Sequence, residues 1–131
     1  YMPKESSFQS QALVYLNSIN GCVAENVSGN SAQSGRADIN GCINGRSFRI
    51  ELKVPDHGNT PSKKQLYDLL RWQKAGALVM VAYTMEDIKL VFRRDGSILP
   101  HFLHEYSDKM IAFVASSKNN TTIESMLEEY E

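Results

Sequence analysis

Residues 37–54 read ADINGCINGRSFRIELKV, and this stretch predicts a β-hairpin on which the rest of the fold is built. Asn44 and Gly45 both tolerate positive φ, which makes them a strong signal for a tight turn between strands 37–43 and 47–54. Apolar and polar residues alternate in the second strand, so the two kinds of side chain point to opposite faces. The apolar set is Phe48, Ile50, Leu52 and Val54, and the polar set is Ser47, Arg49, Glu51 and Lys53.

The segments around this hairpin predict further helices and one buried strand. Helices are expected at 4–19, at 63–75 with Ser62 as N-cap, from residue 85 with Thr84 as N-cap, partly over 98–116, and after Thr121 or Thr122. Strands are expected at 22–27 and, as a continuous apolar run, at 77–83. Mixed elements around one small sheet predict a single α/β domain, with a core at about 4–90 and a helical extension at about 91–131.

Composition narrows the class of protein. The chain has 131 residues, of which 42% are hydrophobic and 22% charged, as in an ordinary globular domain. No apolar run approaches the length of a membrane span and no signal-peptide pattern opens the chain, so we expect no membrane contact and a cytoplasmic location, in a cell or in the host of a phage. Two cysteines exclude a four-cysteine zinc site. A net charge of −1 argues against coating nucleic acid by bulk charge.

Three polar residues of the hairpin have the chemistry of a hydrolytic metal site. Glu51 and Lys53 project from one face of their strand, and the hairpin brings Asp38 toward Glu51. Two neighbouring carboxylates repel each other, and a divalent cation removes that cost. Mg²⁺ prefers carboxylates, waters and phosphate oxygens, and Lys53 adds a positive charge beside a phosphate or an attacking water. This set predicts metal-assisted phosphodiester hydrolysis.

A simpler interpretation explains the same spacing. Alternating charges are common on the solvated face of a hairpin, where Arg49, Glu51 and Lys53 would form ion pairs across strands. Spacing alone does not decide between an exposed ion-pair face and a metal site.

The wider pattern resembles the PD-(D/E)XK nuclease superfamily. Gly35-Arg36-Ala37-Asp38-Ile39 is followed after twelve residues by Glu51-Leu52-Lys53, then by Ser62-Lys63-Lys64-Gln65 and by Ala75-Gly76-Ala77 before an apolar strand. The order and spacing are most similar to the virus-type replication–repair nucleases (VRR-NUC), which include small phage enzymes and the catalytic domain of a Fanconi-associated nuclease. The resemblance covers about residues 5–90 and implies a restriction-endonuclease-like core. One position departs from the pattern, because Ala37 stands where the family usually has proline.

The resemblance also implies a role for each residue of these motifs. It implies that Asp38, Glu51 and the backbone carbonyl of Leu52 bind Mg²⁺ or Mn²⁺, and that Lys53 orients the hydrolytic water and offsets developing negative charge. It further implies that Gln65 supports the site and that Glu5 reaches the metal, with Glu25 as a weaker acidic candidate.

Four cations flank these motifs and are candidate contacts to phosphate, although a solvated surface charge is the slightly better explanation for any single one of them. They are Arg36, Arg46, Lys63 and Lys64. The sequence thus predicts a metal-dependent nuclease acting on DNA, with branched, flapped or four-way DNA as substrates in replication, repair or recombination, and a homodimer as the oligomeric state. The alternative is a catalytically inactive nucleic-acid-binding or assembly module on the same fold.

Overall fold

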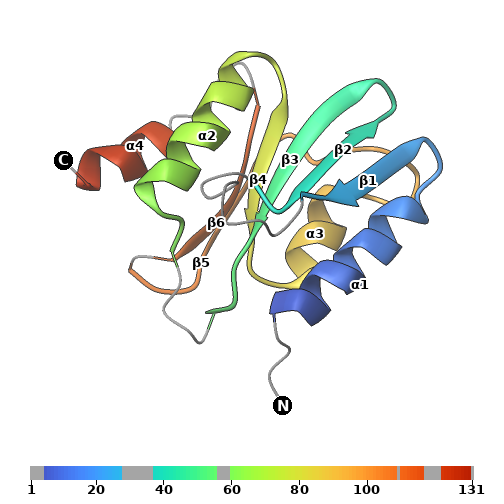
Figure 1. The fold of residues 1–131 in the computed structure, drawn as a ribbon, viewed down its shortest axis with the longest axis horizontal. Helices are drawn as coiled ribbons and strands as arrows, with labels where there is room; N and C mark the ends of the chain where they lie inside the picture. The colour runs from blue at the N-terminus through green and yellow to red at the C-terminus, as the bar shows by residue number, and fades with distance from the viewer. Residues whose placement is uncertain (1–4, 28–36, 56–59, 109, 117–121, 131) are drawn as a thin grey trace.

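The computed structural model describes residues 5–27, 37–55, 60–108, 110–116 and 122–130. They form a six-stranded mixed sheet flanked by four helices (Figure 1). The strands are β1 (Cys22–Asn26), β2 (Ile39–Ile43), β3 (Arg46–Leu52), β4 (Leu78–Ala82), β5 (Phe102–Glu105) and β6 (Ile111–Ala115). The helices are α1 (Glu5–Asn17), α2 (Lys63–Lys74), α3 (Met85–Val91) and α4 (Thr122–Glu129). Within the described ranges, no helix is long and apolar enough to cross a membrane.

The hairpin predicted from Asn44 and Gly45 is confirmed. Ile43 pairs with Arg46 in the antiparallel register of β2 and β3, so the turn between them contains only Asn44 and Gly45. The φ angles of Asn44 and Gly45 are 47° and 86°, the left-handed values that a two-residue hairpin turn of this twist requires. The turn sets the register, and the register in turn brings Ile39 opposite Ile50.

Strands β3 and β4 run parallel and are connected by α2. The sheet order is β1-β2-β3-β4-β6-β5, which places this parallel pair in the middle. All five residues of β4 are buried, as the continuous apolar run predicted. Because parallel strands end at the same edge of a sheet, the carboxyl ends of β3 and β4 lie together, and residues that follow either strand share this edge.

Helices cover both faces of the sheet (Figure 1). Helices α1 and α3 pack on one face around Phe8, Leu16, Phe48 and Ile88, whereas α2 and α4 pack on the other around Leu66, Leu69, Val81 and Phe113. Ser62 and Thr84, the predicted N-caps of α2 and α3, both form complete capping boxes. The mixed α/β class predicted from the sequence is therefore confirmed.

The helical prediction for residues 98–116 is wrong. This segment forms β5 and β6, and β6 extends the sheet by pairing with β4. Its sequence, IAFVA, contains β-branched and aromatic residues that suit a strand, and four of its five residues are buried. The extension after residue 91 consequently contributes two strands as well as α4.

Candidate functional site

Glu51 and Lys53 lie at the carboxyl end of β3, on the face covered by α2. The Glu51 side chain is only 2% exposed and that of Lys53 is 15% exposed, and Lys53 Nζ lies 3.4 Å from Glu51 Oε1. Arg49, further back on the same face, places its guanidinium 3.6 Å from the centre of the Trp72 ring on α2. Helix α2 therefore covers this side of β3, and a solvated ion-pair face does not describe Glu51.

Asp38 lies beside the end of β3 because of the hairpin register. Asp38 immediately precedes β2, whose first residue pairs with Ile50. Its Oδ2 accepts a hydrogen bond of 2.7 Å from the backbone N–H of Leu52. Gln9 of α1 approaches the backbone carbonyl of Asp38 at 3.4 Å. Nothing in the sequence singled out Gln9, because its contact depends on how α1 docks on the sheet.

Gln65 connects the start of α2 to Glu51. Its Oε1 accepts a 2.8 Å hydrogen bond from the backbone N–H of Ser62, which completes the capping box. Its Nε2 donates a 2.7 Å hydrogen bond to Oε1 of Glu51. One side chain thus stabilises the first turn of the helix and holds the carboxylate of β3 in position.

The surroundings of the two carboxyl groups raise the pKa of both. Burial raises the pKa of Glu51 well above its ordinary value, and the nearby Asp38 charge raises it further, while Lys53 opposes the shift. Burial also raises the pKa of Asp38, against the opposing effects of the Leu52 N–H, of a hydrogen bond with the carboxyl group of Glu51, and of Lys53. Oε2 of Glu51 is buried and receives no hydrogen bond from an N–H or hydroxyl donor of the described residues, so the two carboxyl groups depend on a shared proton for their contact. An unpaired buried oxygen of this kind is costly unless a ligand occupies it.

The other acidic candidates are less closely associated with this pair. Glu5 is the first residue of α1, and its side chain lies outside the described part of the structure. Glu25 is exposed on β1, where it pairs with Asn40 rather than with Asp38. Over the described residues, no group of three or more Asp, Glu, His or Cys side chains is arranged to hold a metal ion. Among the side chains that the structure describes, Asp38 and Glu51 are the two acids at the end of β3.

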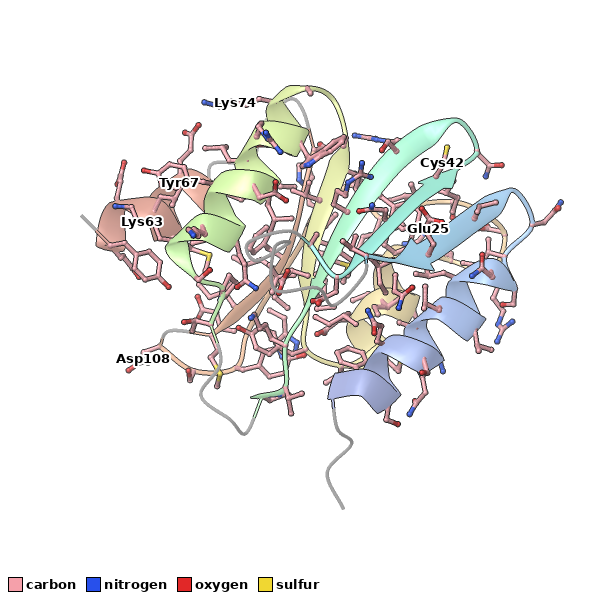
Figure 2. All side chains as sticks on the ribbon, in the orientation of Figure 1. Glu25, Cys42, Lys63, Tyr67, Lys74 and Asp108 are labelled. Atoms are coloured by element: carbon pink, nitrogen blue, oxygen red, sulfur yellow. The ribbon has the colours of Figure 1, made fainter. Side chains whose placement is uncertain are left out.

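The four candidate phosphate contacts separate in space. Lys63 and Lys64 are exposed on the first turn of α2, next to Gln65, and Figure 2 shows Lys63 on the outer side of this helix. Arg46 begins β3, five residues before Glu51, so the two lie about 17 Å apart at roughly 3.3 Å per residue. Arg36 lies outside the described residues. Of the described candidates, the two lysines share the first turn of α2 with Gln65, whereas Arg46 lies at the opposite end of β3 from Glu51.

Comparison with protein-family models, with curated proteins and with solved structures finds no match.

Proposed function

We propose that this protein is a metal-dependent nuclease of the PD-(D/E)XK type that hydrolyses phosphodiester bonds in DNA. The observation that carries the proposal is the buried pair of carboxyl groups of Asp38 and Glu51, with Lys53 beside them and no N–H or hydroxyl donor of the described residues at Oε2 of Glu51. Most buried carboxylate oxygens in folded proteins have such a donor. A divalent cation at this position would remove both the repulsion between the carboxylates and the cost of the unpaired oxygen.

The donor set fits Mg²⁺ or Mn²⁺. Leu52 occupies Oδ2 of Asp38, and Gln65 and Lys53 occupy Oε1 of Glu51, so these contacts leave Oδ1 and Oε2 unused. Lys53 N–H donates to Ala82 of β4, so the N–H and C=O of the preceding Leu52 face the other side of the strand, toward Asp38. Two carboxylates and a carbonyl are the hard oxygen ligands that these ions prefer. A metal bound there would polarise the scissile phosphate and lower the pKa of its bound water.

The protein groups around this position have separate tasks. Lys53 places a positive charge 3.4 Å from Glu51, where it orients the attacking water and offsets negative charge that develops on the phosphate. Gln65 fixes the orientation of Glu51, and its own orientation is fixed by the capping box of α2. Such prior positioning matters because the groups need no rearrangement during the reaction.

The arrangement of elements supports the same proposal. The chain order α1, β1, β2, β3, α2, β4 over residues 5–82 is the order that the family resemblance implies for its catalytic core. The acidic residues and the lysine lie at the end of the parallel pair within that core. Strands β5 and β6 and helix α4 extend this core at the free side of β4. A homodimer that presents two such sites to two strands stays a prediction, which the particle size in solution would test.

A cleavage assay tests the proposal directly. Labelled linear, flapped and four-way DNA would be incubated with the protein in Mn²⁺ and then in Mg²⁺. We expect wild type to cleave, and Glu51→Gln and Lys53→Ala to lose about 100-fold or more, as when one transition-state contact is removed. Lys74→Ala, which removes an exposed lysine at the far end of α2, serves as the control with unchanged cleavage.

Two other outcomes would contradict the proposal. Equal cleavage by wild type and both site variants would place the activity elsewhere. Absence of cleavage in either metal, with DNA still bound, would favour the inactive binding module instead.

A further inference from the structure

A groove of about 620 Å³ runs between α1 and α3, on the face of the sheet opposite α2. These two helices contact each other along the lower right of Figure 1. Ser10, Gln11 and Tyr15 of α1 line one side, and Met85 and Lys89 of α3 with Arg94 line the other. The groove is thus separate from the carboxylates at the end of β3.

Two positive charges converge on one aromatic ring in this groove. Lys89 Nζ lies 5.7 Å from the centre of the Tyr15 ring, and Arg94 Cζ lies 5.2 Å from it. In the described part of the chain, neither cation forms an ion pair with an acidic residue, and Glu86 is the single acid that lines the groove. Both cations line the groove, so an anion bound in it would gain a favourable charge interaction with each of them.

The ring that gathers these cations is held rigidly. Tyr15 is almost fully buried, and its Oη donates a 2.7 Å hydrogen bond to the backbone carbonyl of Phe92. This hydrogen bond connects α1 to the segment after α3, in which Arg94 follows Phe92 by two residues. The aromatic wall beside the two exposed cations is therefore in place before an anion binds.

Both walls of the groove come from elements that reach the edge of the sheet where β3 and β4 end. Ser10 directly follows Gln9, whose amide approaches the backbone carbonyl of Asp38, and Met85 follows the carboxyl end of β4 by three residues. A polynucleotide that places a phosphate at Asp38 and Glu51 has further phosphates on either side of it. The groove is the positively charged surface that such a strand would meet around α1.

We propose that the groove between α1 and α3 binds phosphate groups of a nucleic acid strand, and that Lys89 and Arg94 pair with them. The choice of a strand among phosphate esters rests on the proposed nuclease function. The volume also fits a mononucleotide, since pockets of about 300–1,000 Å³ hold small ligands, so the experiment compares these two sources of phosphate.

The test is binding rather than cleavage, so that the two proposals fail separately. Fluorescence anisotropy would measure the affinity of the full chain for a single-stranded oligonucleotide in EDTA over a series of salt concentrations. Each loss of one phosphate contact lowers the log–log salt slope by about 0.7 for single strands. We expect Lys89→Ala and Arg94→Ala each to weaken binding several-fold and to lower the slope by about that amount.

Arg93→Ala provides the matched control. Arg93 is exposed, carries the same charge one residue from Arg94, and lies close to Asp95 instead of lining the groove. We expect Arg93→Ala to match wild type in affinity and salt slope. We also expect Lys89→Arg, which keeps the charge, to bind as wild type does. The thermal midpoints of all variants would confirm that the fold is intact.

Two results would overturn the inference. If Arg93→Ala weakens binding as much as Lys89→Ala and Arg94→Ala do, overall charge and not the groove attracts the strand. If thymidine 5′-monophosphate binds as tightly as the oligonucleotide with the same dependence on Lys89 and Arg94, the groove takes a phosphate monoester and not a strand. Cleavage by wild type in Mn²⁺ reports on the proposed nuclease independently of either result.

Discussion

Two buried carboxylates lie near the ends of the parallel strands, and they are surrounded very differently. Asp87, in the first turn of α3, is 3% exposed. Its Oδ2 accepts hydrogen bonds from the backbone N–H groups of Tyr83 and Thr84, at 2.8 and 3.1 Å, and from Tyr106 Oη at 2.6 Å. Asp87 also completes the capping box with Thr84. Its charge is therefore used to hold β4, α3 and the end of β5 together.

Glu51 is buried to a similar degree but is only half partnered. It is 1% exposed, and one of its oxygens contacts Gln65 and Lys53 while Oε2 has no partner in the described structure. Burial raises the pKa of Glu51. Oδ2 of Asp87, in contrast, accepts three hydrogen bonds. Burial alone therefore does not mark a functional acid. The proposed metal site rests on the difference at Oε2 of Glu51, which no N–H or hydroxyl donor of the described residues reaches.

The largest expected effect that separates the two carboxylates is stabilisation by metal. A ligand that binds only the folded state at 100 times its dissociation constant adds about 2.7 kcal/mol to the free energy of unfolding. We expect millimolar Mn²⁺ to raise the thermal midpoint of wild type and of Asp87→Asn by several degrees, but not that of Asp38→Asn. Differential scanning fluorimetry checks this, and an equal shift in all three proteins would show that the metal binds elsewhere.

Matched amide substitutions sharpen the comparison in the absence of metal. Asp87→Asn weakens hydrogen bonds to a charged acceptor that contribute about 1.5–3 kcal/mol, so we expect a loss of about 2 kcal/mol in the free energy of unfolding. Glu51→Gln removes a carboxylate that repels Asp38, and we expect no loss or a small gain. Urea unfolding in EDTA measures both values. A similar loss in both variants would mean that Glu51 is as structural as Asp87.

The pH dependence of stability should differ between metal-free wild type and Glu51→Gln. Because the pKa of Glu51 is raised on folding, the folded protein retains a proton that the unfolded chain releases above about pH 4.3. Between that pH and the folded pKa, stability falls as pH rises, by up to about 1.4 kcal/mol per pH unit for one group. We expect metal-free wild type to lose stability relative to Glu51→Gln as pH rises from 5 to 8. Urea titrations at each pH would refute this if the difference stays constant.

The smallest effects concern the double use of Gln65. Ser62→Ala removes the N-cap of α2 and should cost about 1 kcal/mol of stability. Gln65→Glu keeps a residue that suits the capping box but places a carboxylate against Glu51 in place of the amide donor. We expect stability close to wild type and cleavage reduced about tenfold, since a positioned contact to a site residue is lost. Unchanged cleavage in Gln65→Glu would reduce Gln65 to a helix cap.

Local sequence signals predicted much of the fold, and they failed where pairing between distant segments determines the secondary structure. The Asn44-Gly45 turn and the N-caps Ser62 and Thr84 depend on a few neighbouring residues, and all three are confirmed. The partly helical prediction for residues 98–116 failed because strand formation there depends on pairing with the free edge of β4, which is distant in sequence. The alternation in β3 placed Arg49, Glu51 and Lys53 on one face, but it could not show that α2 covers that face.

The sequence by itself determined the α/β class, the hairpin, and the set of acidic and basic residues that suit a metal site. Backbone preferences and side-chain periodicity act over a few residues, so a single chain segment carries them. Only the tertiary structure decided that Glu51 is buried with one oxygen unused, that Gln65 joins a helix cap to that carboxylate, and that Arg46 lies away from it. Desolvation and hydrogen bonding depend on which distant segments pack together, and that information appears only when the sheet and its helices assemble.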